Sequence, residues 1–118
     1  MPLLKVHFAC ELKDEVLNSL SISLSKCIAE ILSKSEDFVM VIFQKTEFQS
    51  FGLNSVQPSL YLELKNVGIL RPDDTRKLTS NITDLCTQFL EVQANRIYIE
   101  YQESERHHWG WDSKTFFK

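Results

Sequence analysis

The feature that most constrains this chain is an order of strand, helix and strand that occurs twice along its 118 residues. In the first half, residues 3–8 alternate apolar and polar side chains, which is typical of a strand with one buried face. Residues 14–34 place leucine and isoleucine every three or four positions, which predicts a helix with one apolar face, and Asp14 fits its N-cap. Residues 38–43 are an unbroken apolar run rich in branched and aromatic residues, which indicates a strand covered on both faces.

The second half of the chain follows the same order. Residues 60–65 alternate as a strand, residues 73–91 carry the apolar spacing of a helix, and residues 97–101 alternate again. Asp73 or Asp74 fits the cap of this second helix. The step from the start of the helix to the start of the following strand is 24 residues in both halves. We therefore expect two β-α-β units, each a right-handed crossover.

Two such units, joined by a loop at about residues 46–58, predict one α/β domain over residues 1–118. Its expected form is a four-stranded mixed sheet with two antiparallel helices on one face. The other face would carry several large apolar side chains, and a soluble monomer does not tolerate an exposed patch of that size. We therefore expect oligomerisation through the sheet. The segment 107–118 holds two tryptophans and two phenylalanines, so it should pack on this subunit or on a neighbour.

Composition excludes several classes of function. The formal net charge is −3, without the basic excess of a nucleic-acid-binding protein. No apolar run is long enough for a membrane span, and the N-terminus lacks the pattern of a secretory signal. Three cysteines without a C-x-x-C pair favour neither a disulfide framework nor a zinc site, and three glycines cannot build a phosphate loop. We expect a cytoplasmic protein without nucleic-acid or membrane partners, exported, if at all, by a route without a signal peptide.

Pro2 is the residue most suggestive of chemistry. Removal of the initiator methionine, which is common before a small residue, would leave a secondary amine at the N-terminus. An α-amino group titrates near ~7.7–8.0, and both burial and the cation of a nearby Lys34 would lower that pKa. An amine that is neutral near pH 7 can act as a general base or as a nucleophile on a carbonyl. Taken alone, a Met-Pro start is weak support for either role.

The expected topology decides which residues can meet Pro2. A crossover helix runs antiparallel to its strands, so Lys34 at the end of the first helix should return to the edge where Pro2 begins the first strand. If the two units meet antiparallel, Val67 at the end of the third strand reaches the same edge. Tyr98, which starts the fourth strand, should lie at the far edge. It could reach a Pro2 site only on a neighbouring subunit.

Seven short segments match a known family in order and spacing. They are Met1–Leu3, Ser33–Met40, Ser50–Gly52, Pro58, Asn66–Gly68, Asn95–Ile99 and Trp109–Phe116. Through them the chain resembles the macrophage migration inhibitory factor family of the tautomerase superfamily over nearly its whole length. The resemblance implies a homotrimer of two β-α-β units per subunit.

It also implies a keto–enol tautomerase, an isomerase acting on phenylpyruvate, dopachrome or related aromatic or 2-oxo acids without a metal or an organic cofactor. By position Pro2 would be the catalytic base. Lys34 and the backbone N–H of Val67 would hold the substrate carboxylate. Tyr98 of the adjacent subunit would line the pocket, with Trp111 and Phe116 as its walls.

Three departures from the family pattern bear on activity. The stretch Ser59–Leu62 stands where vertebrate members carry a Cys-x-x-Cys, which argues against thiol redox activity. Glu100 stands where those proteins have asparagine, and its carboxylate would repel an anionic substrate or raise the Pro2 pKa. Trp109 replaces a smaller residue at the pocket rim and would narrow the opening.

Other interpretations stay open at this point. Lys34 also fits an ordinary lysine that complements a helix dipole, and Tyr98 fits a half-buried strand residue. His107 and His108 are adjacent, and adjacent side chains on a strand or turn point apart, so we expect no metal site there. In place of catalysis, the resemblance also allows a cytokine-like protein that binds a cell-surface receptor, or a trimer with little catalytic activity.

Overall fold

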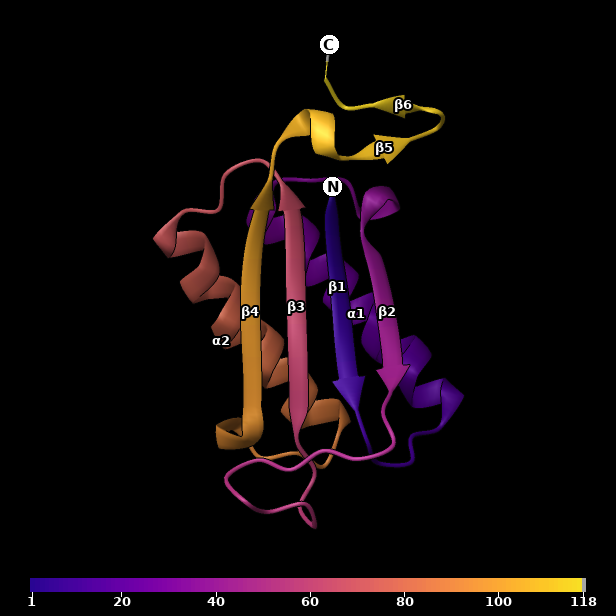
Figure 1. The fold of residues 1–118 in the computed structure, drawn as a ribbon, viewed down its shortest axis with the longest axis vertical. Coiled ribbons are helices and arrows are strands. Elements are labelled where there is room, and N and C mark those ends of the chain that lie inside the picture. The colour runs from indigo at the N-terminus through magenta and orange to yellow at the C-terminus, as the bar shows by residue number, and fades with distance from the viewer. Residues whose placement is uncertain (118) are drawn as a thin grey trace.

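The computed structural model describes residues 1–117 as a four-stranded sheet with two helices on one face (Figure 1). The elements and their bounds are β1 Pro2–Phe8, α1 Asp14–Leu32, η1 Glu36–Phe38, β2 Met40–Lys45, β3 Leu60–Val67, α2 Pro72–Phe89, η2 Ala94–Arg96, β4 Ile97–Ser104, η3 Arg106–His108, β5 Gly110–Trp111 and β6 Lys114–Thr115. Lys118, the last residue of the predicted C-terminal segment, lies outside the described residues. Among those residues, no helix combines the length and the apolar character that crossing a bilayer requires.

The strand order confirms the two predicted β-α-β units. The sheet runs β2-β1-β3-β4, with β1 parallel to β2, β3 parallel to β4, and β1 antiparallel to β3 (Figure 1). Each helix therefore connects a parallel pair, and the two units meet antiparallel through β1 and β3. This arrangement puts the start of β1 and the ends of β3 and β4 at one end of the sheet.

The core lies between the sheet and the two helices. Alternate residues of β1 and β3 point toward the helices and are buried, and they meet one apolar stripe from each helix. The central members are Leu4, Val6, Leu20, Leu24, Ile28, Leu62, Leu64, Leu78 and Ile82. Burial of each such side chain contributes about 1.5–3 kcal/mol to the free energy of folding. Because one face of the sheet is buried in this way, the packing also sets the register between its strands.

The helix ends differ in detail from the sequence prediction. In α1 the N-cap is Lys13 rather than Asp14, and the helix stops at Leu32, two residues early, because Ser33 adopts a left-handed conformation with φ 55°. In α2 the N-cap is Arg71 and Pro72 is the first helical residue, where a missing N–H is harmless. The Asp74 carboxylate accepts a hydrogen bond from the Arg71 backbone N–H, at 3.1 Å, so the predicted aspartate does satisfy the helix start.

The apolar run at residues 38–43 is not a strand covered on both faces. Phe38 belongs to η1, the strand begins at Met40, and β2 is an edge strand with one neighbour. Val41 and Phe43 pack against the core, whereas Met40 is 60% exposed. A short apolar run does not by itself distinguish an inner strand from an edge strand with an apolar outer face.

The sheet face without helices carries polar side chains at its centre as well as the large apolar side chains that the sequence predicted. Its centre carries His7, Tyr61, Glu63 and Glu100. The His7 ring bonds the Glu63 carboxylate at 2.8 Å and stacks on Tyr61 with 5.2 Å between ring centroids. The Tyr61 hydroxyl donates to Glu100, and this bond is the main reason that the Tyr61 pKa is raised to about 12. Met40 and Tyr98, which are 60% and 65% exposed, lie on the same face, and other large exposed apolar side chains lie in the loop after β2.

Candidate active site

The predicted site residues gather where the start of β1 meets the C-terminal segment. In Figure 1 the N-terminus of β1 lies directly below the hairpin of β5 and β6, and the turn between α1 and β2 closes the same end of the sheet. We call this region, formed by Met1, Pro2, Lys34, Val67 and the residues around them, the Pro2 end.

Pro2 is held firmly at this end. It is the first residue of β1, lies opposite Asn66 of β3, and has a fully buried side chain. Met1 precedes it and is half-buried. Burial, and to a smaller extent the charge of Lys34, lower the pKa of the Met1 amino group, because both disfavour its cation. The Met1 amino group is thus biased toward its neutral form.

Lys34 reaches this end through the left-handed turn that stops α1. Ser33 turns the chain, and the Lys34 N–H donates to the Ala29 carbonyl at 2.9 Å. Lys34 then lines a hollow of about 420 Å³ together with Met1, Val67 and the aromatic Phe116. The predicted meeting of the end of α1, the end of β3 and the chain start therefore holds.

A second hollow, of about 260 Å³, lies on the other side of Met1. Pro2 and Trp111 line it together with Phe38 and Trp109, and Phe116 borders both hollows. The Phe38 and Trp111 rings meet edge to face, with centroids 5.2 Å apart at 89°. Five of the six predicted site residues are thus brought together around Met1, and the sixth, Tyr98, is not.

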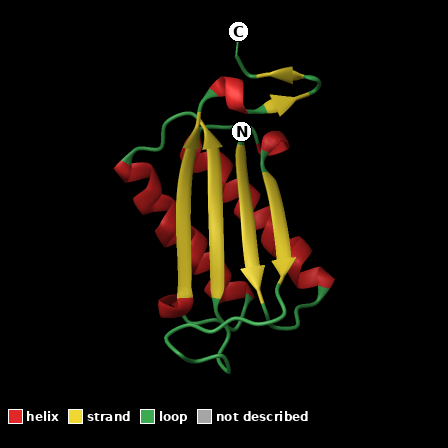
Figure 2. Cartoon of the chain, in the orientation of Figure 1, coloured by secondary structure: helices red, strands yellow, loops and turns green. Residues whose placement is uncertain are grey.

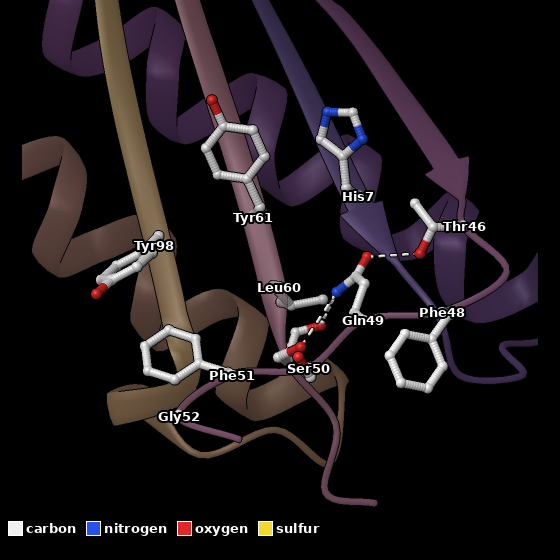
Figure 3. A pocket seen from close by; sticks show the side chains of 11 residues that line it. His7, Thr46, Phe48, Gln49, Ser50, Phe51, Gly52, Leu60, Tyr61 and Tyr98 are labelled. Atoms are coloured by element: carbon white, nitrogen blue, oxygen red, sulfur yellow. Dashed lines mark hydrogen bonds between the residues drawn. The ribbon is translucent and has the colours of Figure 1, made fainter. Parts of the chain in front are cut away.

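Tyr98 lies at the opposite end of the sheet, as its place at the start of β4 predicted. It lines a pocket of about 630 Å³ beside Phe51, with the two ring centroids 4.7 Å apart (Figure 3). We call this region, formed by Tyr98, Phe51, Tyr61 and the loop of residues 46–59, the Tyr98 end. Tyr98 is 65% exposed, so its ring is open to solvent or to another chain.

The loop at the Tyr98 end is fastened by one arginine. Arg96, which is 8% exposed, donates to four backbone carbonyls of the loop at 2.8–3.1 Å. Its guanidinium also lies 5.4 Å from the centroid of the Phe51 ring. Gln49 adds a bond to the Ser59 carbonyl at 2.9 Å (Figure 3). The position of Phe51 against Tyr98 is therefore fixed by a buried polar network.

Sequence reasoning missed two residues of the Pro2 end. Arg106 of η3 lines the hollow that contains Lys34, and Phe38 borders both hollows. Phe38 was assigned to a covered strand, and nothing in the sequence around Arg106 indicated that β4 would be followed by a turn that brings it back to the chain start.

The predicted orientation of the two adjacent histidines is wrong. The rings of His107 and His108 do not point apart, since their centroids are 4.0 Å apart, and Glu105 lies beside them. Both histidines stand in the single turn of η3.

The three cysteines show no sign of redox chemistry. Cys86 is buried, and burial raises its thiol pKa to about 12, which leaves it inert. Cys10 and Cys27 are half-buried and free.

Known proteins resemble this chain over nearly its whole length. A family model described as macrophage migration inhibitory factor matches residues 1–117. The chain belongs to this family. The macrophage migration inhibitory factor of Xenopus laevis is 27% identical over 104 residues, which are 88% of this chain and 90% of that protein.

Solved structures agree with this assignment. A macrophage migration inhibitory factor homologue from Prochlorococcus marinus is 30% identical, with a TM-score of 0.89 over 98% of this chain and 99% of that chain. The macrophage migration inhibitory factor of Toxoplasma gondii is 22% identical, with a TM-score of 0.92 over 97% of this chain and 99% of that chain. The second likeness supports the fold alone. The recognised family places this chain in the tautomerase superfamily.

Proposed function

We propose that this family member is a keto–enol tautomerase that uses Pro2 as its general base. The observation that carries the proposal is the environment of the chain start, where burial and the Lys34 cation both lower the pKa of the Met1 amino group, one residue from the Pro2 nitrogen. A base that is neutral near pH 7 is what proton abstraction next to a carbonyl requires.

Removal of Met1 would complete the pocket. Met1 lines both hollows of the Pro2 end, so its loss joins them and exposes the Pro2 nitrogen between Lys34 and Trp111. The neutral nitrogen then takes a proton from the carbon beside the substrate carbonyl, and the resulting prolinium gives that proton to the carbonyl oxygen as the enol forms. In the reverse direction the nitrogen takes the proton of the enol hydroxyl and returns it to carbon. No metal or organic cofactor takes part in this scheme.

The surroundings favour a small aromatic or 2-oxo acid such as phenylpyruvate. Lys34 offers a cation to the carboxylate, the backbone N–H of Val67 offers a further donor, and Trp111 and Phe116 offer aromatic walls to the ring. Arg106 adds a second cation to the same hollow. The proposed substrate is therefore an anion with an apolar tail.

A homotrimer would supply the missing Tyr98. One chain cannot bring Tyr98 to Pro2, because the two residues lie at opposite ends of the sheet. The outer side of β2 at Met40 and the loop side chains Phe48 and Val56 are exposed and apolar, which suits contact with a second copy. In this arrangement the Tyr98 end of one subunit lies against the Pro2 end of the next.

A second function, receptor binding with little catalysis, has its own support. The similar proteins are named macrophage migration inhibitory factors, and Glu100 and Trp109 depart from the pattern of the family's vertebrate members. In this case the trimer surface rather than the Pro2 amine would carry the function, and a cell-surface receptor would be the partner.

The test uses ketonisation of phenylpyruvate, measured by ultraviolet absorbance. Pro2→Gly, and a chain that keeps a residue before Pro2, should each lose activity by about 10²–10⁴-fold, the usual worth of a general base. Pro72→Ala, at the start of α2, changes a proline that lines neither of the two hollows, so it is the matched control and should keep activity. Intact mass of the wild-type protein should show that Met1 is absent.

Unchanged turnover in both blocked forms would rule out the Pro2 mechanism. An inactive Pro2→Gly protein that still binds cells as the wild type does would assign any signalling role to the surface.

A further inference from the structure

The turn after β4 gathers three side chains with metal-ligating atoms. Glu105 is the N-cap of η3, and His107 and His108 are its last two residues. One ligand atom from each of the three lies within 4.8 Å of the others, and this is the one such group found among residues 1–117. Figure 2 shows the turn as the short red coil between the end of β4 and the C-terminal hairpin.

The geometry of the turn explains why residues so close in sequence converge. A 3₁₀ turn has three residues per turn, so the side chains of Glu105 and His108 lie one above the other. The His108 N–H donates to the Glu105 carbonyl at 3.0 Å and closes the turn. His107 leans to the same side, since its Nδ1 lies 3.4 Å from the Glu105 carboxylate.

The donor set selects a class of ion. Two imidazoles and one carboxylate suit zinc and other divalent transition metals, whereas calcium and magnesium prefer oxygen ligands alone. Zinc binds such ligands at about 2.0–2.2 Å, so neighbouring donors stand roughly 3.4 Å apart in a tetrahedral site. The ligand atoms of the three exposed side chains now lie within 4.8 Å of one another, and small rotations of these side chains would bring them to the spacing of a zinc site.

We propose that Glu105, His107 and His108 form a surface site for a divalent transition metal, with zinc as the expected ion. Three protein ligands leave a fourth position for water. The site is separate from the proposed proton transfer, which needs no metal. It would also brace the C-terminal segment, because the Arg106 carbonyl inside this turn accepts the Phe116 N–H at 3.2 Å.

The neighbouring residues give the site a useful reporter. The chain has two tryptophans, Trp109 and Trp111, and both follow His108 within three residues. A paramagnetic ion bound at the turn should therefore quench most of the tryptophan fluorescence. Zinc binding should also raise the unfolding temperature, because an ion that binds only the folded turn stabilises it.

The experiment uses the full-length protein without a histidine tag, purified with a chelator and then freed of it. Zinc is titrated by calorimetry, and Co²⁺ by visible absorbance and by tryptophan quenching. One ion per chain is expected. His107→Gln combined with His108→Gln should abolish all three signals, and Glu105→Gln should raise the dissociation constant without abolishing binding.

His7→Gln is the matched control, because His7 is the third histidine of the chain and bonds Glu63 on the sheet instead. Binding that survives in this variant and is lost in the double histidine variant supports the site. Absence of zinc binding by the wild-type protein, or equal binding by the double variant with an unchanged circular dichroism spectrum, would overturn the proposal. Phenylpyruvate turnover is not needed as a readout, so this result is independent of the proposed enzyme function.

Discussion

The Pro2 end and the Tyr98 end of the sheet offer different kinds of side chain. The Pro2 end combines an amine whose pKa is lowered with the cations of Lys34 and Arg106. The Tyr98 end offers aromatic rings and neutral hydrogen-bonding groups around its larger pocket (Figure 3). One end therefore has the charge and the base that a tautomerase needs, and the other has an exposed aromatic surface.

The two ends also differ in how they are held. At the Tyr98 end, Arg96 fastens the loop with four hydrogen bonds to backbone carbonyls. At the Pro2 end, strand pairing holds Pro2 opposite Asn66, and the Phe38 and Trp111 rings meet edge to face. The difference suggests complementary halves of one site, which only neighbouring copies of the chain can join. Four predictions test this comparison.

The largest expected effect is restoration of activity by mixing two inactive variants. In a trimer where Pro2 of one subunit meets Tyr98 of the next, Pro2→Gly and Tyr98→Ala damage different halves of the site. Subunits unfolded and refolded together at equal amounts should regain about a quarter of wild-type sites, because half of the subunits keep Pro2 and half of their neighbours keep Tyr98, so that each mixed ring has one intact pair. Phenylpyruvate turnover measures the recovery.

A negative control uses the same end of the molecule. Pro2→Gly mixed with Lys34→Ala should show no more turnover than the Lys34→Ala subunits give by themselves, since both residues belong to the Pro2 end of one subunit and no mixed ring contains a site with both intact. Equal recovery in both mixtures, or none in the first, would contradict a site shared between the two ends.

The next effect is on stability. Arg96→Met keeps the apolar stem but leaves the loop carbonyls without their donor, and each lost bond at a buried group costs about 1–3 kcal/mol. Solvent can reach part of the loop, so we expect a loss of about 3 kcal/mol in the free energy of unfolding, measured by urea denaturation. Arg76→Met removes an exposed arginine of α2 and should change the free energy of unfolding little. Similar values for the two variants would show that the Tyr98 end is not held by Arg96.

Lys34→Ala tests the charge of the Pro2 end. Loss of a charge-assisted bond to the substrate carboxylate should raise KM about tenfold. Burial, the larger cause, and then Lys34 lower the pKa of the N-terminal amine, so removal of Lys34 should raise that pKa in part. The acid limb of the pH profile of kcat/KM should therefore move to higher pH. Lys45→Ala, which removes a cation that pairs with Glu11 away from the site, should leave KM and the profile unchanged.

The sequence predicted the large-scale arrangement because burial patterns are periodic. Alternation in β1 and β3 and the apolar stripes of both helices were enough to derive the order of elements, and the antiparallel meeting of the two units separated Tyr98 from Pro2. The sequence prediction was less accurate where the local backbone geometry of a few residues determines the structure. The left-handed Ser33, the split of the apolar run at Phe38 and the single turn at Arg106–His108 depend on hydrogen bonds that side-chain periodicity does not record.

The polar centre of the open sheet face shows a further limit of sequence patterns. In the sequence, each of these residues fits the alternation of a strand and gives no sign of its neighbours. Only the register shows that Glu63 and Glu100 lie opposite one another on adjacent strands. Like charges there would repel, but each carboxylate has its own partner, His7 or Tyr61. Register, which pairs residues far apart in sequence, creates this network.

The smallest expected effect concerns Glu100, which the sequence suggested as a threat to activity. Its carboxylate accepts the Tyr61 hydroxyl, a bond that raises the Tyr61 pKa to about 12. A raised phenol pKa favours the neutral form in the folded state, so this contribution to stability is present below the ordinary tyrosine range and is lost as the pH rises through 12. Glu100→Gln should bring the Tyr61 pKa back toward about 10, followed by NMR of the labelled ring.

Turnover of phenylpyruvate should change less than twofold if Tyr61 already occupies the carboxylate. A large gain in turnover would instead mean that Glu100 faces the substrate across the subunit boundary, and would make the Tyr98 end a source of charge as well as of aromatic surface.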